Sequence, residues 1–192
     1  MRRALILGGA AAFATLIIPR TSHAAARQIT LKHAGSGATF SGTWHDGRAP
    51  DRSAMQDLSQ VLADPGCPPR AFDVDAIEIL WEVATRTRLT GVLDVHSGYR
   101  TPAVNRAVQG AGDSQHLKAS AVDLGVPTGR LPAVADAALK LRKGGVGVYR
   151  NRGFIHLDSG PVRNWSEGSG GPSIFRNTRF MRLTGTFRIN ER

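Results

Sequence analysis

Short segments with a strict alternation of apolar and polar residues decide the fold class of this chain. In residues 120–126 (SAVDLGV), the valines and the leucine share one face, while Asp123 lies on the other. Residues 92–97 (VLDVHS) and 154–158 (FIHLD) have the same period of two, which is typical of a half-buried β-strand. We therefore expect strands here, each with an apolar face toward a core and a polar face away from it.

Helical segments separate the expected strands. Apolar residues recur three and four positions apart after Asp51 and after Asp73, and an aspartate is a good N-cap. Thr101 followed by Pro102 begins a third, short helix, and Pro132 opens a fourth, because proline in the first turn loses no needed hydrogen bond. Glycines follow the expected ends of these helices, as is common just after the last helical turn.

The run VGVYRNRGFIHLD (146–158) predicts a β-hairpin, because turn-forming residues separate two strand-like segments. Residues 25–48 indicate further short strands and turns. Strands alternating with helices in this order imply an α+β domain. We expect a small, mainly antiparallel sheet with helices packed on one face.

The first 24 residues have the pattern of a signal peptide. Arg2 and Arg3 precede an apolar core, Ala4 to Ile18, and small residues lead to a cleavage site after Ala24. The core is shorter than the about 20 residues that a membrane span needs. We expect export to the periplasm, and the paired arginines permit the twin-arginine route. No stable transmembrane span would remain after cleavage; an uncleaved anchor is the alternative.

The chain is basic, with a formal net charge of +10 that becomes +7 once the three arginines of residues 1–24 are removed. Such a charge attracts anionic envelope polymers or lipid headgroups. Residues 166–192 predict a Gly/Ser linker and an arginine-rich tail, either solvated or drawn to the anionic envelope surface. Nucleic acid is not an expected partner, because the arginines form no stripe and no aromatic platform motif accompanies them.

Cys67 is the only cysteine, which excludes an internal disulfide and a zinc–thiolate cluster. A metal site would therefore need histidines and carboxylates. Asp123 and His156 share a polar face if their strands are neighbours, and His116 lies seven residues before Asp123. Two imidazoles and one carboxylate are a ligand set of catalytic zinc, with a fourth position left for water. The alternative is three ordinary hydrogen-bonded polar residues.

Four motifs together carry a family resemblance: SGYRTP from residue 97, SQHLKASAVD from 114, GGVGVY from 144 and GFIHLDSGPVRNW from 153. They resemble the D-Ala-D-Ala-type zinc peptidases, the group that also contains lysostaphin and the hedgehog signalling domain. Within that group, the chain is most similar to the exported murein endopeptidase K-like branch. The resemblance runs from about residue 28 to residue 165.

This resemblance implies a zinc peptidase domain at residues 25–165, in which His116, Asp123 and His156 hold the ion. It implies activity on peptidoglycan stem peptides, as an endopeptidase that cuts cross-links, including those between two meso-diaminopimelate residues. D-Ala-D-Ala carboxypeptidase or dipeptidase activity is an alternative within the enzymes. A non-catalytic, zinc-containing module that binds the cell wall is the alternative from another class.

Three further residues match positions of the family site. Arg100, in SGYR, matches an arginine that binds a substrate carboxylate or stabilises the oxyanion, for which a planar, permanently charged group is suited. A structural ion pair is its alternative role. Ser114 and Gln115 match positions that line the cleft and bind substrate, although both could be turn residues.

The chain departs from the family pattern at two places. The usual His-x-x-Gly-x-Ala-x-Asp has Ala119 at its glycine position, which costs about 1 kcal/mol if that backbone needs a positive φ. No general base is inherited, since Gly153 and Phe154 stand where other relatives carry an acid or a histidine.

Asp158 lies on the same expected strand face as His156 and offers a catalytic carboxylate. It is expected either to accept a proton from water at the metal or to orient an imidazole ligand. His96 also lies on a polar strand face, either as a site residue or as a solvent-facing histidine.

Overall fold

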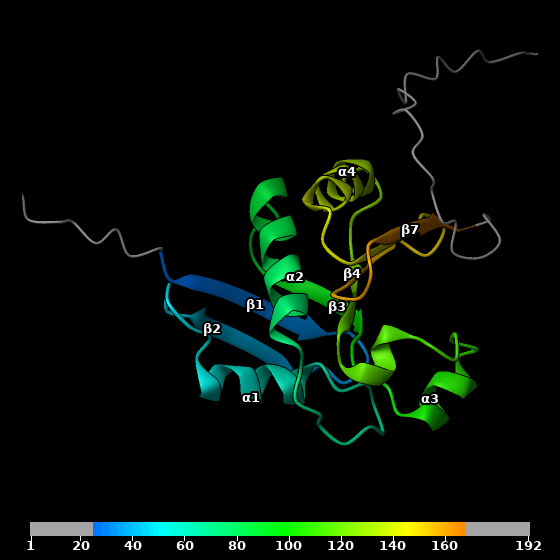
Figure 1. Ribbon diagram of the computed structural model, residues 1–192, viewed down its shortest axis with the longest axis horizontal. Helices are drawn as coiled ribbons and strands as arrows, with labels where there is room; N and C mark the ends of the chain where they lie inside the picture. Colours follow the sequence, from blue (N-terminus) through cyan, green and yellow to red (C-terminus); the bar gives the residue numbers. More distant parts are fainter. Residues whose placement is uncertain (1–24, 168–192) are drawn as a thin grey trace, which may run out of the picture.

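The computed structural model describes residues 25–167, so the predicted signal peptide and nearly all of the predicted tail lie outside the described part. No helix between residues 25 and 167 is long and apolar enough to cross a membrane. The elements, shown in Figure 1, are β1 (Arg27–His33), β2 (Thr39–His45), α1 (Arg52–Val61), α2 (Val74–Thr87), β3 (Leu93–Ser97), α3 (Pro102–Ala107), the 3₁₀ helix η1 (Gln115–Lys118), β4 (Ala121–Gly125), α4 (Leu131–Leu141), β5 (Gly145–Tyr149), β6 (Phe154–Asp158) and β7 (Arg163–Ser166).

One seven-stranded sheet has the order β2-β1-β3-β4-β6-β5-β7. Neighbouring strands are antiparallel except β1 with β3 and β5 with β7, which are parallel. The α+β class with a mainly antiparallel sheet is thereby confirmed, as is the hairpin of β5 and β6. β7 extends to Ser166, one residue into the segment that was expected to begin the linker.

The helix starts follow the predicted caps. Asp51 and Asp73 each accept a hydrogen bond at 2.8 Å from a backbone N–H two or three residues later, and Thr101 accepts one at 3.3 Å. These bonds satisfy N–H groups that have no partner inside the helix. The third helix ends at Ala107, three residues before the predicted stop at Gly110.

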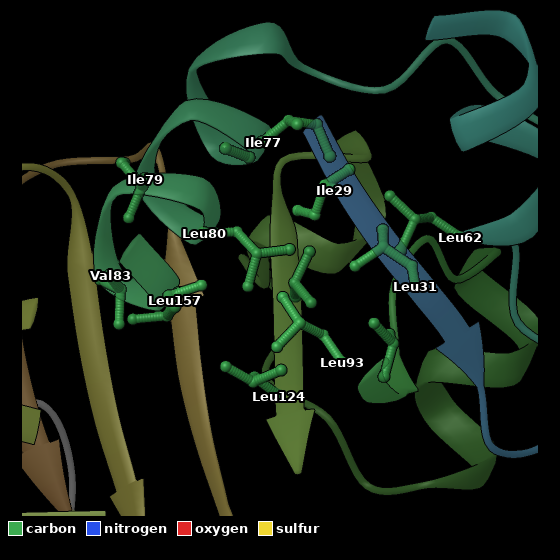
Figure 2. Packing of buried hydrophobic residues seen from close by; sticks show 14 of the residues in the cluster. Ile29, Leu31, Leu62, Ile77, Ile79, Leu80, Val83, Leu93, Leu124 and Leu157 are labelled. Carbon is green, nitrogen blue, oxygen red and sulfur yellow. The ribbon is translucent and has the colours of Figure 1, made fainter. Parts of the chain in front are cut away.

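The core lies on the helix-covered face of the sheet. Leu31, Leu80, Leu124 and Leu157 are almost completely buried and belong to one apolar cluster with residues of α1 and α4. Figure 2 shows Leu80 of α2 gathered with Leu124 of β4 and Leu157 of β6. Since successive residues of a strand face opposite sides, this packing fixes which residues lie on the other face.

On that other face, the strand register aligns five residues in one row. Ser97 of β3 pairs with Asp123 of β4, which pairs with His156 of β6. His156 pairs with Gly147 of β5, and Gly147 pairs with Trp165 of β7. The row crosses five neighbouring strands and places two of the predicted metal ligands directly side by side.

Candidate metal centre

His116 reaches this row from the short 3₁₀ helix before β4. Ser114 is the N-cap of η1, and Ala119 ends it in the left-handed region with φ of 56°. The His116 side chain is buried, and its Nδ1 lies 2.5 Å from the carbonyl oxygen of Gly98. The backbone N–H of Arg100 in turn donates to the carbonyl of His116. The loop before α3 and the 3₁₀ helix therefore hold each other.

The structure brings His116, Asp123 and His156 together. Nε2 of His116 lies 3.2 Å from Nδ1 of His156, and these two nitrogens lie 3.2 and 2.8 Å from Oδ1 of Asp123. All three residues are buried, and their potential ligand atoms lie within 4.8 Å of one another. One ion can therefore be reached by two ring nitrogens and a carboxylate oxygen.

The partners of the two imidazoles decide which nitrogens carry protons. Nδ1 of His116 donates to the Gly98 carbonyl, and Nε2 of His156 donates to Oδ2 of Asp158 at 2.9 Å. A neutral imidazole has one N–H, so the two nitrogens that face Asp123 carry lone pairs. Three electron-rich atoms that face each other repel unless positive charge lies between them, either a metal ion or a proton on an imidazole; the raised pKa of His156, which follows from its hydrogen bonds to Asp123 and Asp158 despite burial, reflects the same demand. The donor set therefore fits a metal ion such as zinc.

Asp123 is ionised in this setting. Burial acts to raise its pKa, but protons on His116 and His156, in the place that a metal ion would take, outweigh burial through their charge and hydrogen bonds and lower the pKa far below the usual range. Nη2 of Arg100 also donates to the second carboxylate oxygen, Oδ2, at 3.0 Å. Oδ1 is thereby left facing the imidazoles, as a cation ligand must be.

Asp158 is fully buried, and its carboxylate is fully occupied. Oδ1 accepts from the N–H groups of Gly145 and Gly160, and Arg163 donates to both oxygens at 3.0 and 2.8 Å. Burial acts to raise the pKa of Asp158, but His156 and then Arg163 lower it to about 2. The carboxylate lies behind His156 and does not line the cleft, which is the geometry of a group that orients an imidazole.

Arg100 lines the cleft while holding Asp123 in place. Its Nε donates to Ser97 Oγ at 2.8 Å and lies 3.4 Å from Asp64, and Nη1 is directed to Asn105 at 3.4 Å. With these bonds and the one to Asp123, three of the five guanidinium N–H groups are directed to protein partners. Both expected features, an ion pair and a cleft-facing cation, are therefore present in the geometry.

Asp64 was not predicted from the sequence, yet it supports the arginine loop from behind. Its carboxylate accepts hydrogen bonds from His33, Ser97 and the backbone N–H of Gly98. Burial acts to raise the Asp64 pKa, but these hydrogen bonds and Arg100 lower it. No local pattern signals this role, because its partners lie more than 30 positions away in the chain.

The cluster lies in a cleft of about 530 Å³. One wall comes from the segment between α3 and η1 and includes Ser114 and Gln115; the other wall comes from β5, β6 and β7. Both residues also make internal hydrogen bonds, since Ser114 caps η1 and Gln115 accepts from Ser120. His96 is exposed on β3, outside the metal cluster, with its ring near Phe154.

Trp165 and Arg163 of β7 are site residues that sequence reasoning missed. The Trp165 ring lies 5.1 Å from the His156 ring, and it reaches there across Gly147. A Cβ on Gly147 would lie 2.4 Å from Trp165, and one on Gly145 would lie 2.6 Å from Arg163. Two glycines at alternate positions of one strand were the available signal, because they leave one face open to a neighbouring strand.

A buried His–Asp–His cluster in an open cleft, on a mainly antiparallel sheet backed by helices, fits a metal-dependent hydrolase. The family model Peptidase_M15_2, described as peptidoglycan L,D-endopeptidase MepK, matches residues 21–165. The chain belongs to this family, which confirms the resemblance found in the sequence.

Curated relatives cover most of the chain. A protein of Escherichia coli (strain K12) named "Peptidoglycan L,D-endopeptidase MepK" is 29% identical over 179 residues, which cover 85% of this chain and 96% of the relative. A Haemophilus influenzae protein named "Probable peptidoglycan L,D-endopeptidase MepK" is 28% identical over 175 residues, covering 85% of this chain and 94% of the relative. The similarity therefore extends over almost the whole length of both relatives.

Proposed function

We propose that this protein is a zinc-dependent endopeptidase that hydrolyses cross-links between the stem peptides of peptidoglycan. The observation that carries the proposal is the convergence of lone pairs from His116, Asp123 and His156 in an open cleft. Membership of the family supports the substrate class, and the names of the relatives support a bond between an L- and a D-centre.

The residues of the cleft have different roles in hydrolysis. Zinc held in this cluster would supply a Lewis acid and would lower the pKa of water to about 7. His116, Asp123 and His156 hold it, and Asp158 keeps His156 in the required tautomer and orientation. The cleft-facing N–H groups of Arg100 suit the negative charge that develops on the scissile carbonyl oxygen.

We assign Asp158 this orienting role in preference to that of a general base. Both of its oxygens already accept hydrogen bonds from His156, Arg163 and backbone N–H groups. A base must come within hydrogen-bond reach of the proton that it removes. The Asp158 carboxylate lies on the far side of the His156 ring from the ligand atoms.

The enzyme acts in the periplasm in this proposal. Residues 1–24 serve as the export signal, residues 25–165 form the peptidase domain, and the basic segment 166–192 attracts the protein to anionic envelope polymers. The signal-peptide pattern and the positive charge of the chain support this assignment.

Digestion of purified, cross-linked muropeptides tests the proposal. Metal-loaded protein should convert dimers to monomers, a chelator should abolish the conversion, and added zinc should restore it; product masses then identify the bond. Release of D-alanine from uncross-linked pentapeptides alone would indicate a carboxypeptidase instead. Dimers that stay intact, together with retention of the protein on cell-wall sacculi, would indicate a non-catalytic wall-binding module instead of an enzyme.

A further inference from the structure

Three arginines line the cleft, and they differ in what holds their guanidinium groups. Arg100 is committed to Asp123 and Arg163 to Asp158, and their side chains are only 12% and 28% exposed. The side chain of Arg152, in the turn between β5 and β6, is 58% exposed. It is the cleft cation that buried carboxylates do not neutralise.

Arg152 is nevertheless held in place. Its guanidinium carbon lies 4.3 Å from the centroid of the Tyr149 ring and 5.0 Å from that of Phe154. Nε lies 3.4 Å from Oε1 of Glu167, whose other oxygen accepts from the backbone N–H of Asn151. Within residues 25–167, the two terminal amino groups of Arg152 have no hydrogen-bond partner. An aromatic support of this kind leaves the planar edge of a guanidinium available for a carboxylate.

A continuous aromatic wall connects Arg152 with the metal cluster. Trp165 packs beside His156, and its Nε1 donates to the Tyr149 hydroxyl at 2.8 Å. The Tyr149 ring stacks on Phe154 with centroids 4.4 Å apart, and Arg152 lies over both. A peptide with its scissile carbonyl at the cluster can therefore extend along this wall toward the terminal amino groups of Arg152.

We propose that Arg152 determines specificity by binding the free carboxylate next to the scissile bond of the cross-link. This inference rests on the proposed function. In a cross-link that ends on diaminopimelate, the carbon bearing the scissile nitrogen also bears a carboxylate. A guanidinium pairs with that group through two parallel hydrogen bonds, whereas an amidated carboxyl at the same place has no charge to pair.

Cross-linked dimers with this carboxyl either free or amidated are the matched substrates. The wild type should cut the free acid with a kcat/KM about 10-fold to 100-fold higher, as expected for a charge-assisted pair. Arg152→Ala should remove this preference, mainly through KM, by lowering the rate on the acid to that on the amide. Arg152→Lys should retain part of it. Arg150→Ala, at an exposed position of the same turn outside the cleft, should behave as the wild type.

Equal rates of the wild type on both substrates would overturn the inference, as would a loss in Arg152→Ala that is the same for both. A binding measurement, which needs no hydrolysis, tests this inference separately from the proposed function. An uncross-linked stem peptide, with its diaminopimelate amine acetylated and its carboxyl free or amidated, is titrated calorimetrically. A preference for the acid that Arg152→Ala abolishes supports the inference even if no dimer is cut. Without that preference the inference fails, whatever the hydrolysis assay shows.

Discussion

At the scale of single residues, Ala119 shows how the chain accommodates a departure from its family pattern. Its φ is 56°, so the position does require the left-handed conformation that the pattern's glycine would adopt freely. The side chain is also completely buried. Backbone strain at Ala119 therefore lowers the stability of the fold, whereas burial of its methyl group raises it.

Replacement of Ala119 should separate these effects. Ala119→Gly relieves about 1 kcal/mol of strain but loses a buried methyl and adds chain entropy to the unfolded state, so we expect a change in unfolding free energy below about 1 kcal/mol. Ala119→Val adds bulk and a β-branch and should cost more than about 2 kcal/mol. Urea denaturation measures both; a well-tolerated valine would contradict this account.

Asp158→Asn tests the orienting role at the metal centre. Loss of the carboxylate behind His156 should weaken zinc binding by about 10-fold to 100-fold and lower kcat. Asp94→Asn, at an exposed position of β3, is the control and should change neither quantity. Competition with a chromophoric chelator measures zinc affinity. Unchanged affinity with abolished turnover would instead make Asp158 the base.

At the scale of elements, β5 acts as a spacer between β6 and β7. Gly145 and Gly147 have no side chains, so Arg163 and Trp165 of β7 reach across β5 to Asp158 and His156. An edge strand thereby contributes to a centre whose nearest proposed ligand, His156, lies two strands away.

Gly147→Ala should disturb this arrangement. The new methyl would lie 2.4 to 2.6 Å from three atoms of the Trp165 ring, which must then shift away from His156. We expect a loss of about 1 to 3 kcal/mol of stability and at least a 10-fold fall in kcat/KM. Gly42→Ala in β2 is the matched control, since its Cβ would meet only an ordinary contact at 3.5 Å. Denaturation and muropeptide kinetics check both; equal behaviour of the two variants would refute the spacer role.

Alternation within strands was enough to predict part of this site. It placed Asp123 and His156 on one face, and their register pairing shows why that worked. The contributions of Trp165 and Asp64 were not predictable in the same way. Trp165 depends on the parallel pairing of β5 with β7, which the alternate glycines of β5 permit without identifying the neighbour, and Asp64 depends on contacts between distant segments.

At the scale of the whole molecule, Asp64 links separate parts of the fold. It lies just after α1 and accepts hydrogen bonds from His33 of β1 and Ser97 of β3, beside Arg100 of the cleft loop. Its carboxylate is nearly buried, so loss of its charge weakens the hydrogen bonds and the ion pair to all of these segments.

The pH dependence of unfolding should reveal this link. Because folding lowers the Asp64 pKa below 3.8, its contribution to stability is complete above about pH 4 and is lost as the pH falls through the lower, folded value. Asp64→Asn should therefore lower the unfolding free energy by about 1 to 3 kcal/mol at pH 7, and the gap should narrow below pH 4. Urea titrations across pH 2.5 to 7 measure it; a gap of constant size would contradict the role of the charge.

The strand order places metal binding and substrate selection on different parts of the fold, so that each can be changed without the other. Asp123 and His156 project from the interior strands β4 and β6, where any change disturbs neighbours on both sides, and His116 projects from the buried 3₁₀ helix beside them. Arg152, the residue proposed to select the substrate, lies instead in the exposed turn between β5 and β6, where a substitution disturbs less of the fold. Substrate preference can therefore change through substitutions in this turn while the metal ligands stay the same.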